Sequence, residues 1–363
     1  MVVRRIELTP VRLPFETRQR MSPDWLLDAL YAVVVEAHDA DGSTGVGYAY
    51  TFNRRYMRPL AAMIEALAEL TVGADPTQPE RHWARLARDV AGVNAEGLGQ
   101  MAIAALDIAL WDLRGKLSGQ PVHRLLGSAR DRLPAYASTY FTGLRSTEDH
   151  VGMAAELAAA GFRAMKLGGA PDDLDGTVAR VRAIRDALGP DVGLMVDYFQ
   201  RLTPDQARQA GRALEDFGLE WLEDPMPADD LDAHAQLARE LQTKVVIGES
   251  FYTLERFAAA IERRAADAVM LDLMRVGGFT GWQVIAAYAE ANGTPVASHL
   301  MTELSVHALA ASRTAYMLEY SPWTFRLFQS TPGIDAGGDV RLTEAPGLGL
   351  DLDQQALAAF RLG

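Results

Sequence analysis

The sequence predicts an α/β protein in which a β/α barrel of eight strands follows an α+β unit. Three observations support this fold class. From about Leu133 onward, short apolar strands alternate with helices rich in alanine and arginine. The expected strand ends lie 20 to 31 residues apart, which is about one β/α unit each. Before that point the order is different, with strands first and helices after them.

The N-terminal unit begins with two strand patterns. Val2–Leu13 and Leu27–His38 are rich in β-branched and aliphatic residues, and a turn follows the second. Helices are expected to begin near Met57, Pro79 and Gly97. We therefore expect residues 1–130 to form an α+β capping domain, 131–325 the barrel, and 326–363 a tail that returns to the capping domain.

The barrel strands are expected to end in chemically useful side chains. The expected ends are Tyr140, Lys166, Asp197, Glu223, Glu249, Asp272, His299 and Glu319. The last inward residue of each barrel strand projects into the mouth of the barrel, where barrel enzymes carry their active sites. The sequence therefore places a possible active site at this end.

Composition excludes several classes of function. The 363 residues carry a formal charge of −13, so no basic surplus is present to bind nucleic acid or an anionic membrane. The chain has no cysteine, which excludes disulfides, thiolate metal sites and a cysteine nucleophile. No apolar run reaches the roughly 18 residues of a membrane span, and the N-terminus lacks a signal-peptide pattern. We expect a cytoplasmic protein.

Three consecutive strands are expected to end in carboxylates, at Asp197, Glu223 and Glu249. Carboxylates that converge without a counter-charge are costly, and a hard divalent cation is the simplest compensation. Mg²⁺ prefers oxygen ligands and leaves coordination positions open for a substrate. A single acid at a strand end usually caps a helix, but three in succession predict one Mg²⁺ per subunit.

Four further residues have expected catalytic roles. Asp272 would fix the tautomer of His299 on the neighbouring strand and raise its basicity, which makes a general base. Lys166 would lie beside the metal. Glu319 would donate a proton in a hydrogen bond to the developing enolate oxygen, although a salt bridge with a barrel arginine is an alternative interpretation.

The sequence resembles the enolase superfamily, and within it the mandelate racemase subgroup, over nearly the whole chain. The resemblance rests on motifs in family order: VDYFQ, WLEDP, IGES, LDLMRVGGFTGW, SHLMTELSVH and MLE. It implies a capping domain over a modified (β/α)7β barrel, with Mg²⁺ on Asp197, Glu223 and Glu249. It also implies a base formed by His299 with Asp272. The other large branch of the superfamily places a lysine where Asp272 stands.

One position departs from the family pattern. Lys166 matches the first lysine of the Lys-x-Lys motif, but Gly168 occupies the second position. Racemisation needs proton transfer on both faces of the substrate, whereas a dehydratase manages with one base. We therefore favour dehydration of a sugar acid or related α-hydroxyacid to a 2-keto acid. The alternatives are a racemase or epimerase with Lys166 as the other acid/base, a cycloisomerase, and a barrel that binds a metal or ligand without catalysis.

Substrate specificity is expected to come from loops of the capping domain and from aromatic residues around the mouth. Arginine suits carboxylate or polyol recognition, although solvated loop arginines are as common. The predicted substrate-binding residues are Arg18, Arg20, Trp25, Arg54, Arg55, Tyr56, Tyr140, Phe199 and Trp323. The expected partner is a small-molecule carboxylate, and family habit suggests a homo-oligomer, either a dimer or an octamer.

Overall fold

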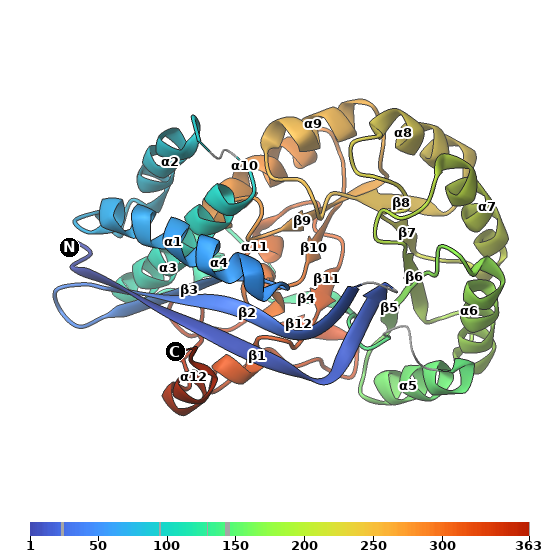
Figure 1. Cartoon of the computed structure of the whole chain (residues 1–363), viewed down its shortest axis with the longest axis horizontal. Helices are drawn as coiled ribbons and strands as arrows, with labels where there is room; N and C mark the ends of the chain where they lie inside the picture. The colour runs from blue at the N-terminus through green and yellow to red at the C-terminus, as the bar shows by residue number, and fades with distance from the viewer. Residues whose placement is uncertain (23–24, 94–95, 129, 142–145, 363) are drawn as a thin grey trace.

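A computed structural model describes residues 1–22, 25–93, 96–128, 130–141 and 146–362, and the side chains from 16 to 26 lie outside what it describes. The chain forms an antiparallel sheet with helices packed on it, joined to a parallel β/α barrel (Figure 1). The predicted fold class is confirmed.

The N-terminal sheet has three antiparallel strands in the order β1, β2, β3. They are β1 (Arg5–Ser22), β2 (Trp25–His38) and β3 (Thr44–Thr51). The sequence did not predict β3, because two glycines interrupt its strand pattern. Those glycines are required, since a Cβ at Gly45 or Gly47 would lie about 2 Å from carbonyl oxygens of the helix packed on the sheet.

Four helices follow the sheet: α1 (Arg54–Thr71), α2 (Pro79–Val90), α3 (Leu98–Ser118) and α4 (Val122–Leu125). The central helix α3 is buried on every side from Gly99 to Leu113. It packs against β3 on one side and against barrel helix α10 (Gly278–Ala291) on another. This helix therefore joins the capping sheet to the barrel.

The barrel wall consists of eight parallel strands. They are β4 (Arg132–Ala137), β5 (Ala164–Gly168), β6 (Gly193–Asp197), β7 (Trp221–Glu223), β8 (Lys244–Ile247), β9 (Ala268–Asp272), β10 (Val296–His299) and β11 (Leu318–Tyr320). Hydrogen bonds from Val296 N–H to Thr314 O (2.9 Å) and from Tyr316 N–H to Val296 O (2.7 Å) close the wall between β10 and the segment before β11.

Four strand ends differ from the prediction, and β5 and β11 run two residues and one residue beyond Lys166 and Glu319. β4 ends at Ala137, three residues before Tyr140, and Glu249 lies two residues after the end of β8. Gly248 separates Glu249 from the strand with φ of +130°, a conformation that suits glycine. The chain therefore turns before Glu249 instead of continuing as a strand.

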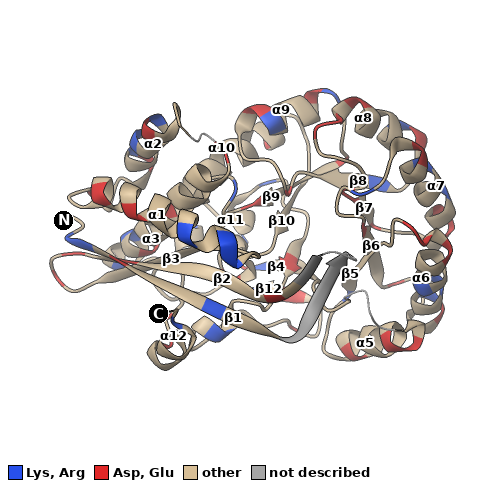
Figure 2. Cartoon of the chain, viewed as in Figure 1, with Lys and Arg blue, Asp and Glu red and all other residues tan. Residues whose placement is uncertain are grey.

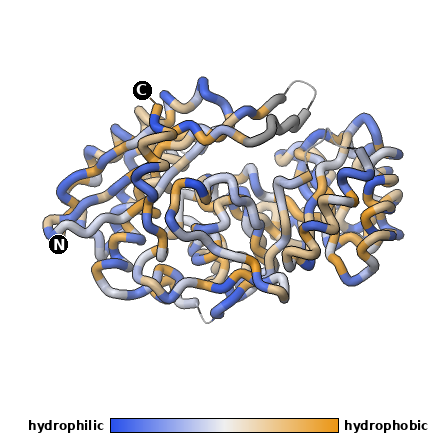
Figure 3. The backbone as a smooth tube through the Cα atoms, turned by 90° about the horizontal axis from the view of Figure 1, so that it is seen from below, coloured by the Kyte–Doolittle hydropathy of each residue, from blue (hydrophilic) through white to orange (hydrophobic). Residues whose placement is uncertain are grey.

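The outer layer of the barrel is helical. It contains α5 (Thr147–Ala159), α6 (Leu174–Leu188), α7 (Pro204–Leu214) with η1 (Glu215–Phe217), α8 (Leu231–Glu240), α9 (Leu254–Glu262), α10 (Gly278–Ala291) and α11 (Thr302–Ala311). Capping boxes at Ser146 and Thr203 begin α5 and α7. Many charged residues of the barrel lie on these outer helices (Figure 2), and hydrophilic and hydrophobic residues alternate along the chain (Figure 3).

The inside of the barrel is filled with side chains. A cluster separate from the main core contains Tyr136, Ala164, Met195, Trp221, Val246, Ala268, Met270 and Ala297, all buried. The rings of Tyr136 and Trp221 meet edge to face, with centroids 5.2 Å apart. The interior is therefore a packed floor beneath the carboxyl ends of the strands.

The C-terminal segment contains η2 (Phe325–Leu327), β12 (Asp339–Arg341) and α12 (Gln354–Phe360). Strand β12 pairs antiparallel with barrel strand β4, whereas α12 packs against β1 of the N-terminal sheet. Leu362 N–H donates to Pro10 O (2.8 Å), and Leu348 N–H donates to Oδ1 of Asp112 on α3 (2.7 Å). Among the described residues, no helix combines the length and the apolar character that crossing a bilayer requires.

Candidate active site

Seven polar side chains meet at the carboxyl ends of the barrel strands. Six belong to strands β5, β6, β7, β9, β10 and β11, and Glu249 follows β8. The six strand residues are Lys166, Asp197, Glu223, Asp272, His299 and Glu319, and each is at most 7% exposed. The structure therefore brings together all the residues for which the sequence predicted a metal-binding or catalytic role.

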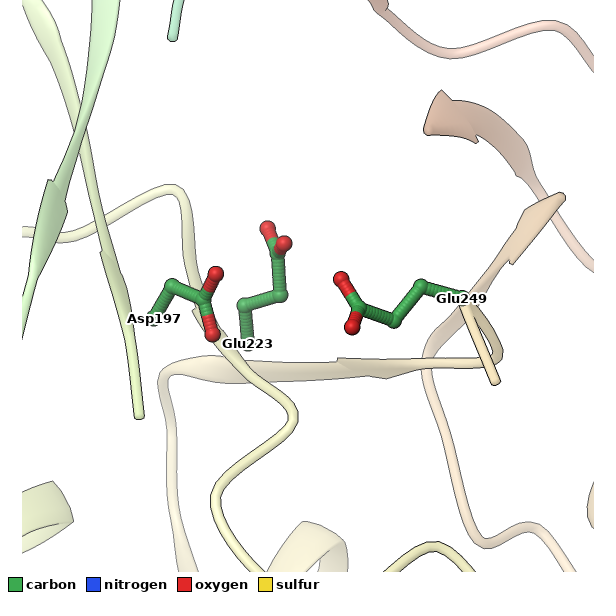
Figure 4. Close-up of side chains that lie close together, drawn as sticks. All are labelled: Asp197, Glu223 and Glu249. Atoms are coloured by element: carbon green, nitrogen blue, oxygen red, sulfur yellow. The ribbon is translucent and has the colours of Figure 1, made fainter. Parts of the chain in front are cut away.

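Asp197, Glu223 and Glu249 face a common point (Figure 4). One carboxylate oxygen from each lies within 4.8 Å of the other two. The side chain of Glu249 is the most exposed of the three, at 15%. The cluster is thus open on the Glu249 side.

The electrostatics of this triad fit a cation. Burial, followed by repulsion from Glu223, raises the pKa of Asp197 well above its usual value. Burial also raises the pKa of Glu223. Two of the three carboxylates are therefore unfavourable as anions in the side-chain environment alone. A hard divalent cation would remove that cost, and the set of oxygen donors matches its preference.

Lys166 compensates part of this negative charge. Its Nζ donates to Oε1 of Glu223, lies 3.0 Å from Oε1 of Glu319 and lies 3.6 Å from Oδ2 of Asp197. Burial lowers the pKa of this amine, but the attraction of Glu223 and Glu319 outweighs burial and raises the pKa well above its usual value. Lys166 is therefore a firmly protonated cation in this arrangement.

His299 and Asp272 form a close pair across neighbouring strands. Nδ1 of His299 lies 2.6 Å from Oδ2 of Asp272, and Nε2 lies 3.1 Å from Oε2 of Glu249. Burial raises the pKa of Asp272, but Arg275 and His299 together hold it below the usual value. An ionised Asp272 accepts a hydrogen bond from Nδ1–H, so Nδ1 keeps its proton and Nε2 is the reactive nitrogen.

The charge state of His299 depends on Glu249. Burial lowers the pKa of His299, but the carboxylates of Glu249 and Asp272 outweigh burial and raise it to about 10. A cation on Glu249 would neutralise the larger of these attractions. The pKa of the imidazole would then fall toward the range in which a general base works at neutral pH.

The contacts of Glu319 differ from those expected of a proton donor, because both of its carboxylate oxygens face hydrogen-bond donors. Its Oε2 accepts a hydrogen bond from the backbone N–H of Leu300 (2.5 Å), and its Oε1 lies next to Lys166. Burial raises the pKa of Glu319, but Lys166 and then His299 outweigh burial and lower it. Without a substrate, Glu319 is therefore an ionised acceptor. The sequence did not reveal this, because the Leu300 contact depends on how the chain turns after β10.

The predicted substrate-binding residues are scattered. Arg54, Arg55 and Tyr56 are exposed at the start of α1, while Tyr140 packs against Phe162 with ring centroids 6.3 Å apart. Trp323 contacts Phe15 of β1 and Phe52 after β3, with centroid distances of 4.9 and 5.7 Å. Phe199 lies against Gly168. The side chains of Arg18, Arg20 and Trp25 lie outside the described residues.

Sequence reasoning missed Arg275, which joins the base to the metal site. Its Nη1 lies 3.6 Å from Oδ2 of Asp272 and also donates to the backbone carbonyl of Glu249. Its backbone N–H donates to Oδ1 of Asp272 (2.9 Å). The signal available in the sequence was an arginine three residues after Asp272, the residue that ends β9.

Two family models match the chain. The mandelate racemase / muconate lactonizing enzyme N-terminal domain matches residues 2–127, and the enolase C-terminal domain-like model matches residues 150–356. Together they span the N-terminal sheet with its helices and most of the barrel.

Individual relatives include both eliminating and isomerising enzymes. A 3,6-anhydro-alpha-L-galactonate cycloisomerase from Streptomyces coelicolor is 32% identical over 100% of both chains. An L-talarate/galactarate dehydratase from Salmonella typhimurium is 32% identical over 89% of this chain and 81% of that one. The structure of L-talarate dehydratase from Polaromonas sp. JS666, complexed with Mg and L-glucarate, superimposes with a TM-score of 0.91 at 30% identity and covers 100% of this chain and 98% of that one.

Proposed function

Because the chain belongs to the mandelate racemase/muconate lactonizing enzyme family of the enolase superfamily, we propose that it removes the α-proton of a carboxylate substrate with the help of Mg²⁺. The favoured reaction is dehydration of a sugar acid or related α-hydroxyacid to a 2-keto acid. The observation that carries this choice is that, among the described residues at the mouth of the barrel, His299 is the one suitable base, with Gly168 where the family has a second lysine. Dehydratases among the relatives support it.

Asp197, Glu223 and Glu249 would hold one Mg²⁺ per subunit. When bound, Mg²⁺ polarises the substrate carboxylate and thereby acidifies the neighbouring C–H group. Glu249 is bound at its backbone carbonyl by Arg275, so its side chain is aimed from a fixed point. Its contact with Nε2 of His299 places the base next to the metal position.

His299 would act twice in the reaction. Nε2 takes the α-proton, and the C–H electron pair moves toward the substrate carboxylate. The same imidazolium then returns the proton to the β-oxygen as the C–O bond breaks, which releases water and an enol that becomes the 2-keto acid. Asp272 keeps the other nitrogen protonated throughout.

Lys166 and Glu319 would stabilise the charge that develops on the substrate carboxylate. Lys166 presents a permanent positive charge beside the metal position. Glu319 is an acceptor in the free site, but a substrate carboxylate that displaced Lys166 from it would repel it electrostatically. That repulsion favours its protonation, so it would become a hydrogen-bond donor when the substrate binds.

The test is a screen of the purified protein with Mg²⁺ against mono- and diacid sugars, read by a 2-keto-acid assay and by NMR in D₂O. We expect a 2-keto acid from the wild type and none from His299→Asn. Asp205→Asn is the control, because that side chain lies on the outer helix α7 and is 80% exposed. Deuterium at the α-carbon without loss of water would move the assignment to a racemase or epimerase.

A cycloisomerase is the second candidate. The full-length similarity to a 3,6-anhydro-alpha-L-galactonate cycloisomerase favours it, and so does the apolar ring of Phe199 beside the site. A ring-opened product with unchanged mass would identify this reaction. Racemisation is less favoured, because Gly168 stands where the family has the second lysine. Metal binding without any proton exchange would instead identify a non-catalytic barrel.

Three further properties stay predictions. They are the domain division at 130/131 and 325/326, a dimeric or octameric homo-oligomer, and a cytoplasmic location. Light scattering coupled to size exclusion measures the oligomer, and limited proteolysis locates the boundaries.

A further inference from the structure

The wall of the barrel mouth at β5 lacks a side chain where one would reach the substrate. Gly168 lies two residues after Lys166 on the same strand, so both residues face the same side of the wall. Strands β6 to β9 separate β5 from the His299 strand β10 on one path around the barrel, and β4 and β11 separate them on the other. A side chain at position 168 would therefore face the substrate from the side opposite His299.

The ring of Phe199 occupies that space. A Cβ built on Gly168 would lie 3.4 Å from Cε2 and 3.9 Å from Cζ of Phe199. In the part of the chain that the structure describes, these are the only atoms within 4 Å of that position apart from the neighbouring residues. A Cβ there would make an ordinary van der Waals contact with the edge of the ring, so a longer side chain at position 168 would have to share the space beside the ring.

An unusual backbone holds Phe199 in this place. Phe199 and Gln200 have φ of +51° and +63°, a left-handed conformation that is rare for large side chains. Phe199 N–H donates to Oδ1 of Asp197 (2.8 Å), and Gln200 N–H donates to Asp224 O (2.6 Å). The Gln200 side chain also donates to Oγ of Ser250 (2.6 Å), after β8. The turn is thus tied to three neighbouring strand ends.

A cation supports the ring as well. The guanidinium carbon of Arg201 lies 5.5 Å from the ring centroid of Phe199. Nη2 of Arg201 donates to Gly169 O (3.1 Å), which fixes the arginine to the end of β5. The ring therefore sits between Arg201 and Gly168 as a fixed part of the wall.

We propose that Phe199, packed against Gly168, is a specificity-determining residue that closes the substrate face opposite His299. This inference rests on the proposed function. A phenyl ring neither takes nor gives a proton, and it excludes water from that side. It packs well against C–H groups but leaves a hydroxyl unpaired. The site would therefore process one configuration at the α-carbon.

The experiment follows exchange of the α-proton in D₂O, with Mg²⁺, for pairs that differ only at the α-carbon. The probes are gluconate with mannonate, galactonate with talonate, and the two enantiomers of mandelate. For the wild type we expect exchange or elimination from one member of each reactive pair, with the other at least 100-fold slower. Comparable rates for both members would overturn the inference but leave the proposed function intact. No reaction with any acid, in these pairs or in the wider screen, would reject both.

Variants test the role of the ring. Gly168→Lys alone should keep the one-sided preference, because Phe199 obstructs the lysine. The double variant Gly168→Lys with Phe199→Ala should raise the slow member at least tenfold, whereas Phe199→Leu should preserve the preference. If Gly168→Lys alone matches the double variant, the ring does not close that face. Thermal unfolding and Mg²⁺ binding, measured on every variant, identify loss of fold.

Discussion

Arg275 contacts Asp272 and the backbone of Glu249 at once, so one guanidinium links the orienting acid of the base to a metal ligand. The pKa of Arg275 lies above its usual value, because attraction by Asp272 and Glu249 outweighs burial. The pair Asp272–Arg275 is therefore an ion pair inside the site and not a surface contact.

Replacing Arg275 by methionine is expected to take the guanidinium away from buried Asp272 and to leave the carboxylate with His299 and the backbone N–H of residue 275 as its partners. Breaking a buried pair in this way costs about 3–5 kcal/mol of stability. The turnover of the identified substrate should also fall at least tenfold, because Asp272 would no longer be held for His299. Urea unfolding and kcat measure the two effects. The control Arg256→Met breaks an exposed pair with Asp229. It should leave both the free energy of unfolding and kcat nearly unchanged.

Removal of one carboxylate from the triad should have opposite effects with and without metal. Asp197→Asn is expected to stabilise the metal-free protein, because it removes repulsion from Glu223. In Mg²⁺ at a hundred times its Kd, the wild type gains about 2.7 kcal/mol, and the variant should gain much less. Thermal unfolding in EDTA and in Mg²⁺ measures whether the order of stability of the wild type and the variant reverses. Equal shifts for both proteins would place the metal elsewhere. The exposed Asp205→Asn serves as the control for charge.

The pH dependence of stability should contain a contribution from Asp107 on α3. Burial raises its pKa to about 7, despite hydrogen bonds from Thr280 N–H (3.0 Å) and Oγ1–H (2.7 Å). The folded chain thus binds a proton that the unfolded chain loses near pH 4. The associated stability is fully present below about pH 4 and is lost as the pH rises toward 7. Asp107→Asn should flatten this part of the profile in urea titrations, and exposed Asp232→Asn should not.

A buried hydrogen bond joins the capping sheet to the barrel. Tyr48 O–H on β3 donates to Oε1 of Glu303 on α11 (2.6 Å), which also accepts from Oγ1 of Thr324 (2.6 Å). Tyr48→Phe should cost about 1–3 kcal/mol, because Glu303 loses a donor while buried. Denaturant unfolding measures this loss. The same change at exposed Tyr56 should be neutral, and an equal effect at both positions would argue against a specific contact.

The strand ends were predictable because alternation along a strand fixes which residue faces the mouth. Asp197, Glu223, Asp272 and His299 follow this rule directly. Glu249 was found too, although a glycine turn and not the strand presents it. The rule failed for Tyr140, since β4 ends earlier and the following chain turns toward Phe162.

Contacts made by turns and distant backbone were not predictable. The N–H of Leu300 that binds Glu319 and the reach of Gln200 to Ser250 depend on left-handed residues after β6 and β10. The strand β3 escaped detection because its glycines serve the close approach of α3, which no local pattern reveals. The contact between the Phe199 ring and Gly168 was likewise not predictable, because it joins the turn after β6 to the end of β5.

The packed interior of the barrel also sets how molecules travel. Tyr136 lies beneath Lys166, with Nζ 5.6 Å from the ring centroid, and Nε1–H of Trp221 donates to Oε2 of Glu223 (2.8 Å). Within the part of the chain that the structure describes, these buried rings fill the lower end of the barrel, so a substrate would enter and a product would leave at the carboxyl ends of the strands. A product would then have to leave before the next substrate binds. Accumulated product would compete with substrate for the same opening.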